Sequence, residues 1–249
     1  MKPLDNCAHF VACLALAILA SSGVAACADR DELRTIVQQQ CLPHWLETKS
    51  AAPCVSLHLD GNGSGASGFA VLADRKGGAH YLLIPTRTIS GIESPEARSA
   101  SGPNYFDAAW EARGVLNAAA RRELRRTEIG LAVNSVHARS QDQLHVHIEC
   151  LGKPLYEALG ASADRLGSQW SGIQVLGWQY QAVRVIGTEL GEHNPFLLLA
   201  DSLSGARQSM GDYSLLVAAV DFSDGPGFVV LAGHAVPGAE RLLDASCAV

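Results

Sequence analysis

The chain has 249 residues, of which 48% are hydrophobic and 18% are charged, so it is long and apolar enough to bury a core and is not an extended disordered protein. Its formal net charge is −6 and its basic residues are scattered, without the basic stripe by which proteins grip nucleic-acid phosphates. We therefore expect a globular protein with no nucleic-acid partner.

The first 28 residues are predicted to be a targeting segment outside the fold. No Asp, Glu, Lys or Arg occurs from Cys7 to Ala28, and this run contains a signal-peptide-like core and is just long enough to span a bilayer. Three outcomes are open, namely cleavage after Ala28, lipidation at Cys27, or retention as a single-pass anchor. In each case the remaining body, residues 29–249, is exported and is predicted to form one domain.

The body is predicted to be α+β, with an antiparallel sheet of hairpins and meanders and a few flanking helices. In chain order we expect a helix at 31–40, a strand at 55–59, a hairpin of strands at 68–73 and 79–84, a helix capped by Asn104 and reaching about residue 126, strands at 129–133 and 144–151, a helix reaching 165, strand-like runs within 173–186, 213–222 and 228–235, and a helix at 195–202.

Four cysteines lie in the body, and an even number in an exported chain suggests two disulfides. Three pairings are possible. Cys41 and Cys54 flank a short loop that contains proline, which favours joining them and leaves Cys150 to bind the C-terminus through Cys247. No Cys-x-x-Cys spacing of a metal site occurs among them.

The strand that begins near Gln143 carries the residues best suited to chemistry. Apolar and polar residues alternate strictly from Gln143 to Cys150, and successive side chains of a strand point to opposite faces. The apolar face is predicted to pack on the core. The other face is predicted to be open and to present a row of polar side chains, Gln143, His145, His147 and Glu149.

Three interpretations of His145 and His147 follow from the residues alone. They are half-exposed histidines without a role, an interpretation that two neighbouring imidazoles weaken. They are zinc ligands, which requires a third ligand such as His80, His58, His137 or a carboxylate. Or one of them is a nucleophile, because a neutral imidazole can attack phosphorus and form a phosphoramidate that water then cleaves. The strand does not decide between the last two.

A family resemblance favours the nucleophile. The arrangement Gln143-x-His145-x-His147, preceded by an Asn and a Ser on a polar loop, resembles the histidine-triad superfamily of nucleotide hydrolases and transferases. Within that superfamily, three segments resemble the CDP-diacylglycerol pyrophosphatase family: Leu82-Leu83-Ile84-Pro85-Thr86, Ile89-x-Gly91-Ile92-Glu93-Ser94-Pro95, and residues 140–150. The likeness extends from about Leu33 to Cys247 and includes the four body cysteines.

The resemblance implies a role for several polar residues. His145 falls on the nucleophile, and His147 on a residue that acts on the phosphate or the leaving oxygen. Gln143 replaces the first histidine of the triad and can hydrogen-bond a phosphate without supplying a proton as an imidazolium does. Ser140 falls on a serine that contacts phosphate, and Asn134 on an amide of the site. We add Arg139, the only cation of that loop, as a phosphate ligand, and His80, Thr86 and Glu93 as further pocket candidates.

The resemblance also implies a histidine-triad-like domain at 29–249 that hydrolyses CDP-diacylglycerol to CMP and phosphatidate, without requiring a cofactor or a metal. The expected partners are this lipid nucleotide and, through the N-terminus, the membrane. We expect the protein at the bacterial inner membrane, with its catalytic domain facing the periplasm. The alternatives are a soluble-nucleotide diphosphatase, a His-ligated metallohydrolase and a non-enzymatic envelope lipoprotein.

Overall fold

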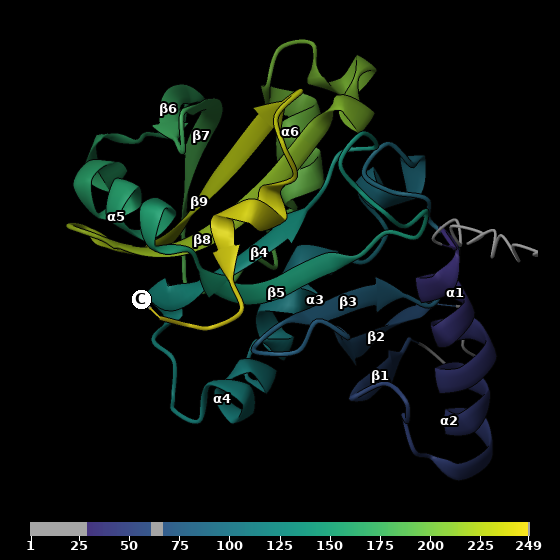
Figure 1. The fold of residues 1–249 in the computed structure, drawn as a ribbon. Helices are drawn as coiled ribbons and strands as arrows, with labels where there is room; N and C mark the ends of the chain where they lie inside the picture. Colours follow the sequence, from purple (N-terminus) through teal and green to yellow (C-terminus); the bar gives the residue numbers. More distant parts are fainter. Residues whose placement is uncertain (1–28, 61–66, 249) are drawn as a thin grey trace, which may run out of the picture.

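A computed structural model of the chain describes residues 29–60 and 67–248. Its strands are paired antiparallel in one sheet (Figure 1). The order across the sheet is β1 (Ser56–Leu59), β2 (Gly68–Ala73), β3 (Tyr81–Pro85), β5 (Val146–Leu151), β4 (Ile129–Val133), β8 (Tyr213–Phe222), β9 (Gly225–His234), β7 (Trp178–Ile186) and β6 (Ser171–Val175), with β10 (Leu243–Asp244) paired to the end of β5.

The helices flank this sheet, so the predicted α+β class with an antiparallel sheet is confirmed. They are α1 (Glu32–Ile36), α2 (Leu42–Thr48), α3 (Tyr105–Ala112), α4 (Val115–Ala120), α5 (Lys153–Ser162) and α6 (Pro195–Ser202). The predicted anchor lies outside the described residues. Within 29–60 and 67–248, no helix has the length and apolar character needed to cross a bilayer.

Two predicted helices differ from the structure in length. The helix expected at 31–40 continues through a π-helical turn (Val37–Cys41) into α2, so that most of the expected cysteine-bounded loop is helical. Pro43 lies directly after the π-helical turn, inside the continuous helix, and a proline there has no N–H to donate to the preceding turn. The change from α- to π-helical winding immediately before Pro43 is the kind of irregularity that accompanies such a missing bond. The helix expected to reach residue 126 ends instead at Ala112 and resumes as α4, which Arg121 terminates in a left-handed conformation. Its predicted cap is confirmed, since Asn104 Oδ1 accepts from the N–H of Asp107.

The two faces of the sheet bury different clusters of side chains. On one face α3, α4 and α6 cover the central strands, and Trp110 packs edge-on against Phe228 of β9. The opposite face carries two separate clusters. One lies under α5, over β4, β8 and β9, and the other lies under α1 and α2, over β1 to β3 (Figure 1).

Strand β5 runs between these two clusters. Its His147 is paired with Leu82 of β3 on one side and with Ala132 of β4 on the other. Leu82 belongs to the cluster under α1, whereas Ala132 belongs to the cluster under α5. The polar residues of β5 therefore interrupt an otherwise apolar face of the sheet.

Both predicted disulfides are confirmed, Cys41–Cys54 and Cys150–Cys247. The first joins the π-helical turn to the segment before β1. The second joins β5 to the C-terminal segment, where β10 and the short 3-10 helix η7 (Ala239–Leu242) also contact β5 or the residues that follow it. The C-terminal segment is thus held beside β5 by both covalent and backbone contacts.

Removing the second disulfide is expected to destabilise the protein more than removing the first. The double variant Cys150→Ala/Cys247→Ala should lose about 2–4 kcal/mol of unfolding free energy, because the bridge restricts a long loop of the unfolded chain. The matched control Cys41→Ala/Cys54→Ala opens a loop of sequence separation 13 rather than 97, and its loss should be smaller by about 1–2 kcal/mol. Urea unfolding of the oxidised proteins measures both, and a wild-type stability for the first variant would contradict the expectation.

Candidate active site

The alternation of β5 positions its side chains as predicted, but the polar face is not open. Val146, Ile148 and Cys150 lie in the core cluster under α3. On the other face His145 is 7% exposed and His147 is 4% exposed. The imidazoles are therefore held in an environment that disfavours their charged forms.

The His145 ring is oriented by a backbone carbonyl two residues earlier in the chain. It directly precedes β5, and its Nδ1 lies 2.8 Å from the carbonyl oxygen of Gln143. Because a carbonyl can only accept, Nδ1 carries the proton and donates it, which leaves Nε2 with a free lone pair. Burial also lowers the pKa of His145 below its ordinary value. His145 is thus a neutral imidazole with the tautomer that a nucleophile requires.

Gln143 holds the segment that carries His145. Its Nε2 donates to the carbonyl oxygens of Pro85 at 3.1 Å and Arg87 at 2.8 Å, which fixes the loop against the end of β3. The side chain is fully buried and does not line the adjacent cavity. In this structure Gln143 fixes the segment before β5, and its contact with a phosphate stays a prediction.

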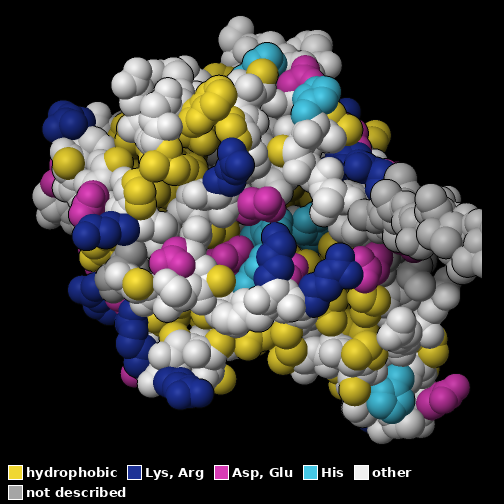
Figure 2. Space-filling view, viewed as in Figure 1, with side chains coloured by type: hydrophobic (Ala, Val, Ile, Leu, Met, Phe, Trp, Pro, Cys, Tyr) yellow, Lys and Arg dark blue, Asp and Glu magenta, His cyan; other side chains and the backbone are white. Residues whose placement is uncertain are grey.

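A cavity of about 490 Å³ opens beside the histidines and collects four of the predicted site residues, namely His145, His147, Ser140 and Asn134. Figure 2 shows histidine side chains at the bottom of a hollow near the centre of this face, surrounded by acidic and basic side chains. The cations that line the cavity are Arg75 and Lys76, from the turn between β2 and β3. The sequence predicts only a hairpin connection for this turn.

Arg139, predicted to be a phosphate ligand, does not line the cavity. Its Nη1 donates to Glu93 at 2.6 Å, and its Nε and Nη2 donate to Asp142 at 3.2 and 3.1 Å. The guanidinium lies so close to Gly91 that a side chain at that position would collide with it. Arg139 therefore braces the loop in this structure, and its contact with a phosphate stays a prediction. Thr86 and Glu93 likewise do not line the cavity.

Glu240 belongs to the site, although no local pattern in the sequence points to it. It lies on η7, and its Oε2 accepts from Asn134 Nδ2 at 2.6 Å. The same oxygen lies 3.2 Å from His147 Nε2. Asn134 thus holds the Glu240 carboxylate beside Nε2 of the His147 ring.

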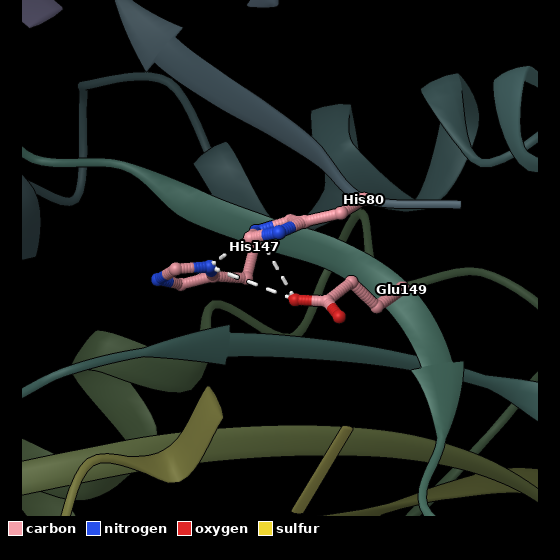
Figure 3. Close-up of side chains that lie close together, drawn as sticks. All are labelled: His80, His147 and Glu149. Atoms are coloured by element: carbon pink, nitrogen blue, oxygen red, sulfur yellow. Dashed lines mark hydrogen bonds and ion pairs between the residues drawn. The ribbon is translucent and has the colours of Figure 1, made fainter. Parts of the chain in front are cut away.

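His80 completes a cluster of three side chains behind His147. Tyr81 is paired with Ile148, so the same register places His80 opposite Glu149. His80 Nε2 lies 3.0 Å from His147 Nδ1 and 3.1 Å from Glu149 Oε1, and Figure 3 shows the three side chains pointing toward one another.

Burial is the main cause of the pKa shifts in this cluster. It lowers the pKa of His80 and lowers that of His147 well below its ordinary value. It raises the pKa of Glu149 to about 8, with the negative charge of Glu240 adding to the effect. Two imidazole nitrogens and one carboxylate oxygen are also suitable ligands for a metal ion.

The other histidines considered as metal ligands lie elsewhere. The side chain of His58 is 63% exposed and faces Asp60, and that of His137 is 68% exposed and pairs with Asp212. Neither belongs to the cluster, so the register of β3 against β5 selects His80 from the candidates.

Comparison with known proteins assigns the chain to a family. Residues 28–249 match the family of CDP-diacylglycerol pyrophosphatases, a match that includes every residue of the cavity. A protein of Yersinia pestis named CDP-diacylglycerol pyrophosphatase is 40% identical over 227 residues, which cover 88% of this chain and 84% of the relative. The chain belongs to the CDP-diacylglycerol pyrophosphatase family.

Proposed function

We propose that this protein hydrolyses the diphosphate bond of CDP-diacylglycerol to CMP and phosphatidate, with His145 as the nucleophile. Family membership makes the chain a hydrolase of this substrate class. The observation that supports the nucleophile is the hydrogen bond from His145 Nδ1 to its own backbone, which leaves Nε2 unprotonated beside the cavity. We also infer that the sheet is histidine-triad-like, from the placement of His145 and His147 at the start of a central strand.

In the proposed reaction, His145 Nε2 attacks the cytidylyl phosphorus and the bond to the phosphatidate oxygen breaks. The positive charge that develops on the imidazole is stabilised because Nδ1–H already donates to the Gln143 carbonyl. Water then attacks the phosphorus, the N–P bond breaks, and CMP leaves with His145 regenerated as the free base. The proton lost by the water passes to the phosphate products or to solvent.

The remaining cavity residues supply donors and charge for the diphosphate. His147 lines the cavity, with its Nε2 3.2 Å from Glu240 Oε2, and we infer that it acts on a phosphate or on the leaving oxygen. Ser140 contributes a hydroxyl, while Arg75 and Lys76 bring positive charge to the rim. Positioning and charge stabilisation of this kind provide most of the rate in phosphoryl transfer.

The cavity also has an apolar wall, formed by Leu33 and Ile36 from the first helix, Leu72 of β2 and Leu82 of β3. The glycerolipid half of CDP-diacylglycerol can bury apolar surface against this wall. A soluble nucleotide diphosphate, whose second substituent is small and polar, has no comparable apolar surface to bury there. This wall favours the lipid nucleotide over a soluble nucleotide as substrate.

The N-terminal segment is proposed to retain the protein at the bacterial inner membrane, with the catalytic domain in the periplasm. The uncharged run from Cys7 to Ala28 supports export, and the two disulfides are consistent with an oxidising compartment.

Replacing His145 is expected to abolish turnover. His145→Ala removes the attacking nitrogen and should lower kcat by on the order of 10³-fold or more, as loss of a nucleophile does in other hydrolases. The matched control is His137→Ala, whose exposed imidazole pairs with Asp212 outside the cavity and should not be needed for turnover. CMP release from radiolabelled CDP-diacylglycerol in detergent micelles measures both variants. Wild-type turnover by folded His145→Ala would disprove the mechanism.

A charge on the apolar wall is expected to weaken the use of the lipid substrate selectively. Ile36→Asp should lower kcat/KM for CDP-diacylglycerol by about 10-fold or more, because a misplaced polar group or lost apolar contact in a binding site costs about 1–3 kcal/mol. Cleavage of CDP-choline, a soluble nucleotide diphosphate, should change little. The control is Leu46→Asp on the exposed surface of α2, which should affect neither substrate. An equal loss on both substrates in Ile36→Asp would show that the wall does not select the lipid.

The mature protein is expected to fractionate with membranes and to keep or lipidate its N-terminal segment. A single-pass helix holds a protein at the membrane far more firmly than one acyl chain does. Intact-mass measurement on protein from the native envelope distinguishes the three possible N-termini. A mass that begins at Asp29, recovered from the soluble fraction, would be inconsistent with retention.

A further inference from the structure

We propose that His80, His147 and Glu149 bind a divalent transition-metal ion, with zinc the best match, on the side of His147 away from the cavity. The three facing atoms are His80 Nε2, His147 Nδ1 and Glu149 Oε1, separated by 3.0, 3.1 and 3.8 Å (Figure 3). Zinc bonds of about 2.0–2.2 Å in a tetrahedral site put neighbouring ligand atoms about 3.3–3.5 Å apart. The triangle already has the size that three ligands of one ion require.

Hydrogen bonds alone satisfy this cluster poorly. His80 Nε2 carries at most one hydrogen, yet two acceptors lie within hydrogen-bond distance of it. The two acceptors, His147 Nδ1 and Glu149 Oε1, are 3.8 Å apart, too far to bond each other. Within the described part of the chain, Glu149 pairs with these two histidines and forms no ion pair with Lys or Arg. A buried carboxylate of this kind needs a proton or a cation, and one ion would serve all three lone pairs.

The outer nitrogens of both imidazoles face carboxylates, as in many metal sites. His80 Nδ1 lies 3.8 Å from Asp74 Oδ1, and His147 Nε2 lies 3.2 Å from Glu240 Oε2. A histidine that binds a metal through one nitrogen must carry its hydrogen on the other, and a carboxylate commonly receives that hydrogen. His147 Nε2 thus lies within hydrogen-bond distance of an outer carboxylate, whereas Asp74 lies near His80 Nδ1 but beyond that distance. This observation is independent of the distances within the triangle.

The position of the ion defines its role. Of the three ligands, only His147 lines the cavity, so the ion lies behind the substrate and does not activate water in contact with it. A metal on Nδ1 keeps the proton of His147 on Nε2, the atom beside Glu240 Oε2, and prevents the ring from turning. The ion would therefore fix His147 as a donor. It would also offset the negative charge of Asp74 and Glu240 in a cavity that must accept an anionic diphosphate.

This arrangement leaves His145 as the nucleophile, so the inference goes beyond the proposed function without replacing it. Metal binding can be read without any assay of turnover, and His145→Ala should keep the metal while losing activity. A failure of the metal site and a failure of the nucleophile are therefore distinguishable.

The experiment is a metal analysis of the purified full-length protein, followed by chelator treatment and titration with Co²⁺. The wild type should contain about one equivalent of zinc per chain and should give the visible absorption of tetrahedral Co²⁺. His80→Ala and the nearly isosteric Glu149→Gln should weaken Co²⁺ binding by at least about 100-fold, at the upper end of what losing an outer contact alone costs. The control is His58→Ala, an exposed histidine paired with Asp60 that should bind as the wild type does.

Wild-type protein that neither contains zinc nor binds Co²⁺ would overturn the site, as would unchanged binding in folded His80→Ala and Glu149→Gln. If both variants fail to fold, the wild-type titration still decides. For the positioning role, chelation should lower wild-type kcat with little change in KM, and zinc should restore it. A metal-bound enzyme whose kcat is insensitive to chelation would overturn that role.

Discussion

The register of β5 against its neighbours is the constraint on which the site depends. Successive side chains of this strand lie in different surroundings. Val146 and Ile148 pack in the core on one face of the sheet, while His147 and Glu149 form part of the polar site on the other. A slip of one residue would exchange the two faces completely. Pairing with β3 and β4 on its two sides, and the covalent link at Cys150, hold the strand in the one register that serves both. The same register brings His80 opposite Glu149.

A second consequence is that the site occupies a gap between two apolar clusters. The cluster under α1 and the cluster under α5 do not merge across β5, since His147 and Glu149 are polar and only Leu151, at the end of the strand, joins the cluster under α5. The C-terminal segment fills part of this gap and contributes Glu240, which Asn134 holds in place. Burial in this gap lowers the pKa of His147 and raises that of Glu149, and contacts between the polar groups offset only part of the cost of burying them. The polar residues of the candidate site thus lie between two apolar clusters on the same face of the sheet.

Local patterns in the sequence predicted those parts of the protein that local forces determine. Alternation identified β5, the helix at 195–202 was predicted with its observed bounds, and the cap at Asn104 was correct. His145 and His147 reach the cavity because strand periodicity fixes which face they occupy. The break after Ala112 was missed, since a continuous helical pattern does not show where the chain must turn to pack.

The sequence says least about residues whose partners are distant in the chain. Arg139 was assigned to phosphate because Glu93, 46 positions away, could not be recognised from the sequence as the carboxylate that binds it. Glu240 was missed for the same reason, and Lys76 because a polar hairpin turn carries no sign of the cavity it borders. The charge of a side chain indicates only that it will pair with an opposite charge. Whether that opposite charge belongs to the substrate or to another residue depends on the tertiary fold.

The point where the chain enters the domain lies at the mouth of the cavity. Arg30 makes a two-pronged ion pair with Asp142, and the backbone N–H of Leu33 donates to Gln141. Both Glu32 and Leu33 border the cavity itself. If the domain is tethered to a bilayer through this end, only a few residues separate the cavity from the lipid surface. Its substrate would then arrive by sliding within the leaflet, so that encounter becomes a two-dimensional search governed by surface density rather than by bulk concentration.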